Sequence, residues 1–214
     1  RQRDLKRLVA FSSLSHMGFI VIGTFALTGQ SVSGAVVEMM NHGLYTAALF
    51  LLIAMIYRRR RTFEIAKLHG LQSAAPVMAG IFTLVMLASI GVPGLNGFVG
   101  EFLILTGTFS AHRWWAVVAV LGVVISAVYM LWAYQQVFHG SQEATANEEP
   151  FRDVTTRERL VLVPLIVLIV FLGVYPKPVL DRIEPSVNQL IAHIHQVEST
   201  NVLTANALSP LEGK

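Results

Sequence analysis

The sequence predicts an all-α integral membrane protein with five transmembrane helices, the third of them discontinuous. The chain is 54% hydrophobic and 14% charged, with a mean hydropathy of +0.59, whereas soluble domains carry about 25% charged residues. The apolar residues are gathered in runs close to the ~20 residues that a membrane-spanning helix needs. One run is interrupted by a Gly/Pro/Asn stretch at 91–97. A break at membrane depth is tolerated where it is buried in protein or lines a wet cavity.

The membrane domain is expected over 8–175, after a basic flank at 1–7. The last apolar run is short for a span and contains Pro164. Aromatic residues lie near the ends of several runs, as they do at membrane interfaces. The five predicted spans cover 8–28, 34–57, 76–109 (broken at 91–97), 114–138 and 160–175.

Two polar segments complete the predicted organisation. Residues 139–159 are polar and interrupted by proline, which predicts a loop. Residues 176–214 form a tail, in which apolar residues from Val187 to Val197 recur at helical spacing. This spacing predicts a short amphipathic helix at the membrane surface. Because the chain opens with a basic segment and no Met, we interpret it as the interior of a longer polypeptide.

The distribution of positive charge predicts the orientation. Twelve of the 16 Lys and Arg residues fall in 1–7, 58–67 and 139–159, which lie on one side of the membrane in the five-span arrangement. The positive-inside rule places that side in the cytoplasm, so the N-terminal end is cytoplasmic and the C-terminus faces outward.

Composition also excludes several classes of site. With 0 cysteines the chain has no thiolate metal site, no Cys-ligated iron–sulfur cluster and no disulfide. The sequence pI of about 9.5 is explained by membrane topology, and the arginines at 58–61 fit lipid headgroups better than nucleic acid. His193 and His195 point apart on a helix. We therefore predict a lipid-bilayer partner, no nucleic acid, no metal site and no catalytic residue in this chain.

Glu101 is the leading candidate for a functional residue. It lies within apolar sequence just after the break formed by Pro93, Gly94, Asn96 and Gly97. A charge near the bilayer centre costs about 2.5–3.5 kcal/mol on insertion scales, so such residues mark functional sites. If a half-helix restarts near Asn96, its unpaired amides and dipole help to hold the carboxylate. The sequence predicts an ion or proton path here.

Three further polar residues fit such a path. His16 lies deep in the first run, and Glu38 and His42 share a face of the second run four residues apart. Histidine titrates near physiological pH, so a chain of these groups can pass protons. Two other interpretations stay open: the histidines bind helices together by hydrogen bonds, or Glu38 reaches the outer interface.

Three segments resemble the signatures of the antiporter-like subunits of respiratory complex I. They are residues 4–18, which include Ser12-Ser-Leu-Ser-His16-Met-Gly18, residues 41–50, which begin Asn-His-Gly-Leu-Tyr, and residues 97–105, which include Gly100-Glu101. The resemblance covers roughly 1–175. In carrying glutamate at position 101, the chain resembles the M-type subunits, which are equivalent to chain 4 of mitochondrial NADH dehydrogenase. The other types carry lysine in the discontinuous helix.

The resemblance implies the last five helices of a fourteen-helix antiporter-like fold in a bacterial plasma membrane. It implies a proton-translocating subunit of NADH:quinone oxidoreductase, with L- and N-type subunits as partners. NADH, FMN, iron–sulfur clusters and quinone would belong to partner subunits, and this chain would hold no cofactor. Glu101, His16 and His42 would belong to the polar axis. Glu38 departs from the family pattern, where a neutral residue is expected.

Two alternatives remain at this point. The same signatures occur in multi-subunit cation/proton antiporters and membrane-bound hydrogenases. The second alternative is a structural membrane scaffold, whose polar residues only bind helices together.

Overall fold

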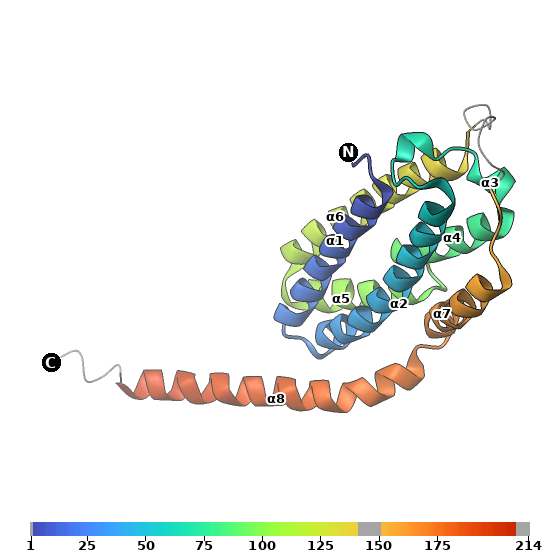
Figure 1. Cartoon of the computed structure of the whole chain (residues 1–214). Helices are drawn as coiled ribbons and strands as arrows, with labels where there is room; N and C mark the ends of the chain where they lie inside the picture. The colour runs from blue at the N-terminus through green and yellow to red at the C-terminus, as the bar shows by residue number, and fades with distance from the viewer. Residues whose placement is uncertain (1, 141–150, 209–214) are drawn as a thin grey trace.

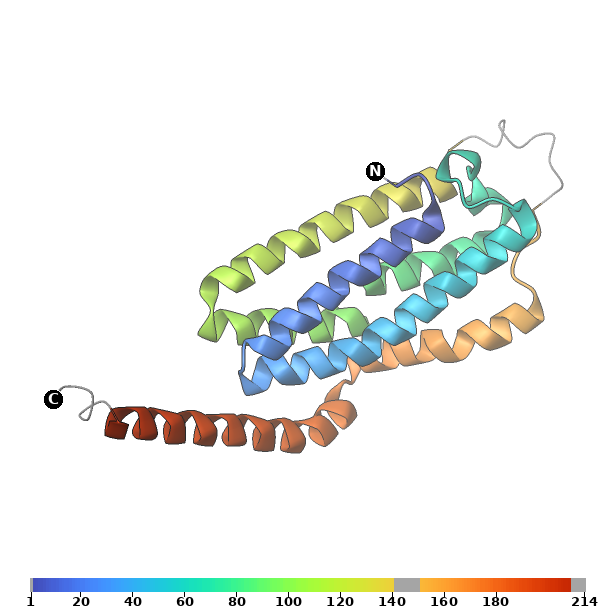
Figure 2. The same cartoon turned by 60° about the vertical axis from the view of Figure 1, so that its left-hand side comes forward.

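The computed structural model describes residues 2–140 and 151–208, so Arg1, the middle of the predicted loop and the end of the tail lie outside the described residues. A helical bundle contains α1 (Leu5–Phe25), α2 (Gly29–Arg60), α6 (Arg113–Phe138) and α7 (Thr156–Val174) around the broken pair α4 (Pro76–Ser89) and α5 (Asn96–Ala111) (Figure 1). The short helices η1 (Ile65–Lys67) and α3 (Leu71–Ala74) connect α2 to α4. The last helix, α8 (Lys177–Leu208), leaves the bundle and extends beyond it (Figure 2).

Among the described residues, three helices are each long and apolar enough to cross a membrane: α1, α2 and α6. The helix α7 and the part of α8 up to Val197 are together long and apolar enough to cross a membrane, with a bend of 69° between them. The helix α4 is apolar but shorter, with 14 residues. The predicted all-α membrane class is therefore confirmed. The number of five spans stays a prediction, because α4 and α5 are each shorter than a full span.

Several helices begin before the apolar run that predicted them. The Asp4 carboxylate accepts the Arg7 amide at 2.8 Å and starts α1, whereas the predicted span begins at residue 8. Capping boxes at Thr28 and Thr155 start α2 and α7 in the same way. The start of a helix is set by its capping residue, while a predicted span is set by hydrophobicity.

The break between α4 and α5 is shorter than the sequence predicts. It covers 90–95, and Gly91 and Gly94 adopt positive φ angles of 71° and 93°. Pro93 and Gly94 lie in the break as predicted, but Asn96 and Gly97 form the first turn of α5. Gly97 packs against the backbone carbonyl of Ala88, where a β-carbon would overlap it. The two half-helices thus meet through backbone contact.

Glycines also let α2 approach α5 closely. A β-carbon on Gly34 would lie 2.7 Å from Leu103 Cβ, and one on Gly107 would overlap Ser31. Glycine at a helix interface brings two backbones together, as in other membrane bundles. This contact sets the distance between the polar faces of α2 and α5.

The basic segments gather at one end of the bundle. Leu5 N donates to Phe63 O at 2.8 Å and Gly70 N to His139 O at 3.1 Å, which ties the N-terminal end to the ends of α2 and α6. The N-terminus and α3 lie at this end in Figure 1. The grouping agrees with the charge pattern that predicts the orientation.

The tail differs most from the prediction. The prediction of a short helix in the tail is wrong, because α8 has 32 residues. Beyond Pro185 its sequence contains no Gly or Pro to end it. Val187 is buried, and Asn188 lies beside Gly29 at the start of α2.

Candidate functional site

Three ionisable side chains from three helices meet inside the bundle. His16 comes from α1, Glu38 from α2 and Glu101 from α5, and their exposed fractions are 3%, 0% and 6%. The Nδ1 atom of His16 lies 3.4 Å from Glu101 Oε1 and 3.9 Å from Glu38 Oε1. The structure thus brings together three of the four residues predicted for proton transfer.

The glycines near the break make room for both carboxylates. A β-carbon on Gly91 would overlap the carboxylate of Glu101, and one on Gly100 would overlap that of Glu38. Gly91 has a positive φ angle, which a residue with a side chain rarely adopts. The broken helix therefore supplies space for the two acids as well as interrupting the span.

Tyr45 and His42 surround this group on α2. The Tyr45 hydroxyl donates a hydrogen bond of 2.7 Å to Glu38 Oε1. The ring of His42, which is half-buried, has its centroid 5.7 Å from that of His16 and 5.5 Å from that of Tyr45. The four-residue spacing of Glu38 and His42 suggests that these two side chains pair. The structure instead pairs Glu38 with Tyr45. His42 joins the group through the two rings.

Several polar atoms of the group have no hydrogen-bond partner among the described residues. They are both ring nitrogens of His16, Glu38 Oε2 and His42 Nε2. Most buried polar side-chain atoms in proteins are hydrogen-bonded, so exceptions call for an explanation. A cluster with free lone pairs at a helix break can take up protons, water or a cation.

A pair of asparagines holds the start of α5 beside this group. Asn41 Nδ2 donates to the backbone carbonyl of Asn96 at 2.7 Å, and the Asn96 amide donates to Asn41 Oδ1 at 3.2 Å. Both side chains are fully buried. Because α5 begins at Asn96, the pair fixes where Glu101 lies relative to Glu38.

The suggestion that Glu38 reaches the outer interface is wrong. Since α2 begins at Gly29, Glu38 lies between two and three turns inside the helix and is fully buried. Sequence reasoning also missed the role of Tyr45. The signal was present, because Glu38 and Tyr45 are seven residues apart and lie on one helix face.

A second polar assembly closes the basic end of the bundle. The Arg59 guanidinium binds both carboxylate oxygens of Glu158, at 2.7 and 3.0 Å, and the backbone carbonyls of Arg152 and Asp153. The Asp153 carboxylate in turn accepts the amides of Val77 and Met78, at 2.9 and 3.0 Å. The residues before α7 thus link the end of α2 to the start of α4.

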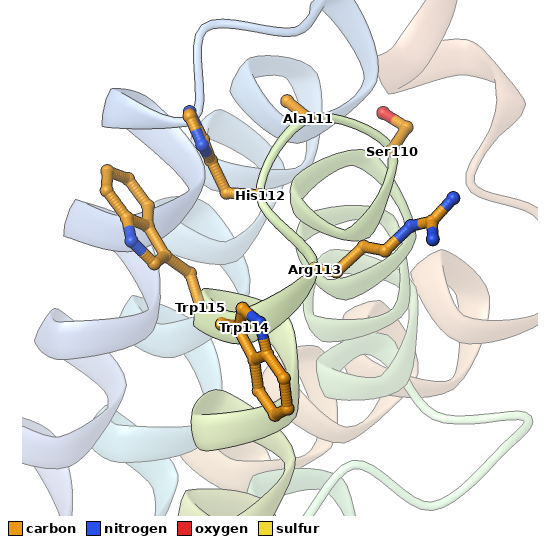
Figure 3. Close-up of a pocket in the computed structure, with 6 residues that line it drawn as sticks. All are labelled: Ser110, Ala111, His112, Arg113, Trp114 and Trp115. Carbon is orange, nitrogen blue, oxygen red and sulfur yellow. The ribbon is translucent and has the colours of Figure 1, made fainter.

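An open pocket lies at the turn between α5 and α6, near the other end of the bundle (Figure 3). The rings of His112 and Trp115 stack with centroids 4.2 Å apart, and the side chain of Trp114 is 80% exposed. Exposed tryptophans beside an arginine are typical of a membrane interface. The pocket is lined by Ser110, Ala111, His112, Arg113, Trp114 and Trp115.

Comparison with known proteins places this chain in a family. A family model described as "NADH:quinone oxidoreductase/Mrp antiporter, TM" matches residues 1–126. The chain belongs to this family. With several helices long and apolar enough to cross a membrane among its described residues, it is a multi-pass membrane protein, and the predicted resemblance is confirmed.

Three known proteins illustrate the similarity. NADH-quinone oxidoreductase subunit M of Mycobacterium tuberculosis is 46% identical over 91% of the chain. A chain of respiratory complex I from Thermus thermophilus has a TM-score of 0.82 and 34% identity over 89% of the chain, and a chain of the Mrp complex from a Dietzia species has a TM-score of 0.79 and 19% identity over the same share. The chain spans 35%, 40% and 43% of these proteins, respectively.

Proposed function

We propose that the chain is part of a proton-translocating membrane-arm subunit of NADH:quinone oxidoreductase. The observation that carries the proposal is the 3.4 Å approach of His16 to Glu101, two ionisable groups buried beside a broken helix. Ionisable residues at this depth are expensive, and they mark ion and proton pathways. A contact that only holds helices together does not need a second buried carboxylate. Glu38 nevertheless provides one in the same cluster as Glu101.

The arrangement suggests a role for each group. Glu101, beside the break, takes up and releases a proton. His16 lies between Glu101 and Glu38 and relays protons through its ring. Tyr45 holds Glu38 in place through its hydroxyl. His42 is half-buried, so it connects the group toward the less buried side.

The relatives support complex I over the antiporter alternative. The match to a subunit M at 46% identity is much closer than the 19% identity to the Mrp complex, which indicates the shared fold alone. In this assignment the chain sits beside L- and N-type subunits in a bacterial plasma membrane, with its N-terminal end in the cytoplasm. NADH, FMN, the iron–sulfur clusters and quinone bind to other subunits, and quinone reduction there changes the charge along the polar axis.

The test replaces Glu101 in the assembled complex. Glu101→Gln keeps the size of the side chain and removes the ionisable group, and Glu101→Ala removes both. We expect the complex to assemble and NADH-driven proton pumping in membrane vesicles, followed with a pH-sensitive dye, to be abolished or strongly reduced. Glu184→Gln, at an exposed carboxylate on α8, is the matched control and should pump normally. Full pumping in assembled Glu101→Gln would overturn the proposal and favour the scaffold.

A further inference from the structure

We propose that His16, Glu38 and Glu101 form a binding site for a divalent transition-metal ion of the zinc type. One ligand atom from each residue can be chosen so that all three lie within 4.8 Å of one another. Zinc binds nitrogen and carboxylate oxygen at about 2.0–2.2 Å, which places tetrahedral ligands about 3.4 Å apart. The observed separations of 3.4 and 3.9 Å from His16 Nδ1 are close to this spacing.

The charge of the cluster favours a divalent cation. Two buried carboxylates are costly unless they are protonated or paired with positive charge. Within the part of the chain that the structure describes, His16 is the basic side chain in ion-pair distance of both. A bound divalent ion would cancel the two negative charges without any proton.

The free lone pairs point to coordination as well. His16 is 3% exposed, and neither of its ring nitrogens is hydrogen-bonded among the described residues. Its Nδ1 atom faces both carboxylates. Tyr45 donates to Glu38 Oε1, the oxygen 3.9 Å from His16 Nδ1, and so orients that carboxylate. Outer hydrogen bonds of this kind are a regular part of protein zinc sites.

The ligand types select among metals. Calcium takes six to eight oxygen ligands and magnesium a nearly ideal oxygen octahedron. One imidazole nitrogen and two carboxylates suit zinc and its neighbours in the first transition row. The ligands come from three helices and are 22 and 63 residues apart along the chain, which explains why the sequence pattern predicts no metal.

Metal and protons would compete for the same atoms. Coordination requires a neutral imidazole and ionised carboxylates, so binding releases any protons that these groups carry and tightens as the pH rises. If these groups also carry protons, as proposed above, zinc bound here inhibits proton transfer. The binding itself does not depend on that function.

The experiment uses the whole complex, stripped with a chelator and titrated with zinc chloride, and bound zinc is measured by elemental analysis. We expect one tight equivalent that is lost in Glu38→Gln. Tyr45→Phe keeps all three ligands and should weaken binding by about 10–100-fold, as the loss of an outer-shell hydrogen bond does. His112→Gln removes an exposed histidine outside the cluster and should keep the equivalent. Excess calcium or magnesium should not displace it.

Equal zinc binding in the wild type and Glu38→Gln would overturn the proposal. If the variant does not assemble, electron cryo-microscopy of the wild-type complex with and without zinc replaces it. Density between the three side chains supports the site, and its absence at saturating zinc rules the site out. Zinc binding is measured without pumping, so the two proposals can fail separately. Glu101→Gln can lose pumping although the wild-type complex binds no zinc at the cluster. The wild-type complex can also bind zinc there although Glu101→Gln pumps normally.

Discussion

Asn41 on α2 donates its side-chain amide to the backbone carbonyl of Asn96, the first residue of α5, at 2.7 Å. The Asn96 amide returns hydrogen bonds to the side-chain oxygen and the backbone carbonyl of Asn41, at 3.2 and 3.4 Å. Glu38 precedes Asn41 by less than one turn, and Glu101 follows Asn96 by less than two. The reciprocal pair therefore sets the register of the two carboxylates across the helix break.

Replacement of Asn41 by Leu should loosen this register. Leu has a similar volume but removes the donor to the Asn96 carbonyl and the side-chain acceptor of the Asn96 amide, at about 1–3 kcal/mol for an unsatisfied buried group. We expect a lower melting temperature of the assembled complex and reduced proton pumping per NADH oxidised. Gln72→Leu, an equivalent change at an exposed position on α3, should leave both unchanged. Identical pumping in Asn41→Leu and the wild type would show that the pair does not position the acids.

The membrane class follows directly from the sequence, but the start of each helix does not. Long apolar runs locate the bundle helices because lipid and the protein core both select apolar residues. The first turns are polar, and their positions depend on Asp4, Thr28 and Thr155, whose side chains satisfy free amides. The length of α8 was missed because amphipathic spacing marks a face and not an end.

The site was predictable as a set of residues but not as a geometry. Burial cost and the Gly/Pro/Asn break single out Glu101, and helical spacing adds His16, Glu38 and His42 to the set. No sequence signal shows that α1 places His16 between the two carboxylates, because that depends on how three helices pack. The same holds for Asp153, which reaches α4 across 75 residues of chain.

Gly100→Ala tests the room left for Glu38. The added β-carbon would lie 2.8 Å from Glu38 Cβ and 2.9 Å from Glu38 Cα, so α2 and α5 must separate. Overpacking of this kind costs about 1–3 kcal/mol. We expect less assembled complex on native gels and weaker pumping. Gly43→Ala has nothing within 4 Å of the new methyl group and is the control; equal loss in both variants would count against the close contact.

Asp153→Ala tests the cap on the first half-helix. The side chain accepts from the second and third residues of α4, Val77 and Met78, while Ala75 at the N-cap offers no side-chain hydrogen bond. Loss of a cap costs about 0.5–2 kcal/mol. The melting temperature of the complex should fall measurably. Asp181→Ala breaks an exposed ion pair with Lys177 and should have little effect; a larger fall for Asp181→Ala would contradict the assignment.

The Arg59–Glu158 pair should stay ionised at every working pH. Glu158 lies in the first turn of α7, before the predicted apolar span begins at residue 160. Its hydrogen bonds from Arg59 lower the pKa of Glu158 to about 2 from an ordinary value of 4.5. A carboxyl with a lowered pKa contributes stability above the ordinary value and loses it as the pH falls toward the lowered one. The contribution is therefore constant between pH 5 and pH 8.

Arg59→Met should lower the melting temperature of the complex by the same amount at pH 5, 6, 7 and 8. Hydrogen bonds to a charged group contribute about 1.5–3 kcal/mol, and both side chains here are 14% exposed. Lys67→Met removes an ion pair whose side chains are 67% and 44% exposed, so its effect should be much smaller. A difference between Arg59→Met and the wild type that shrinks from pH 8 to pH 5 would mean that the pair titrates. In that case it would respond to the proton gradient instead of holding α2 and α7 together at every pH.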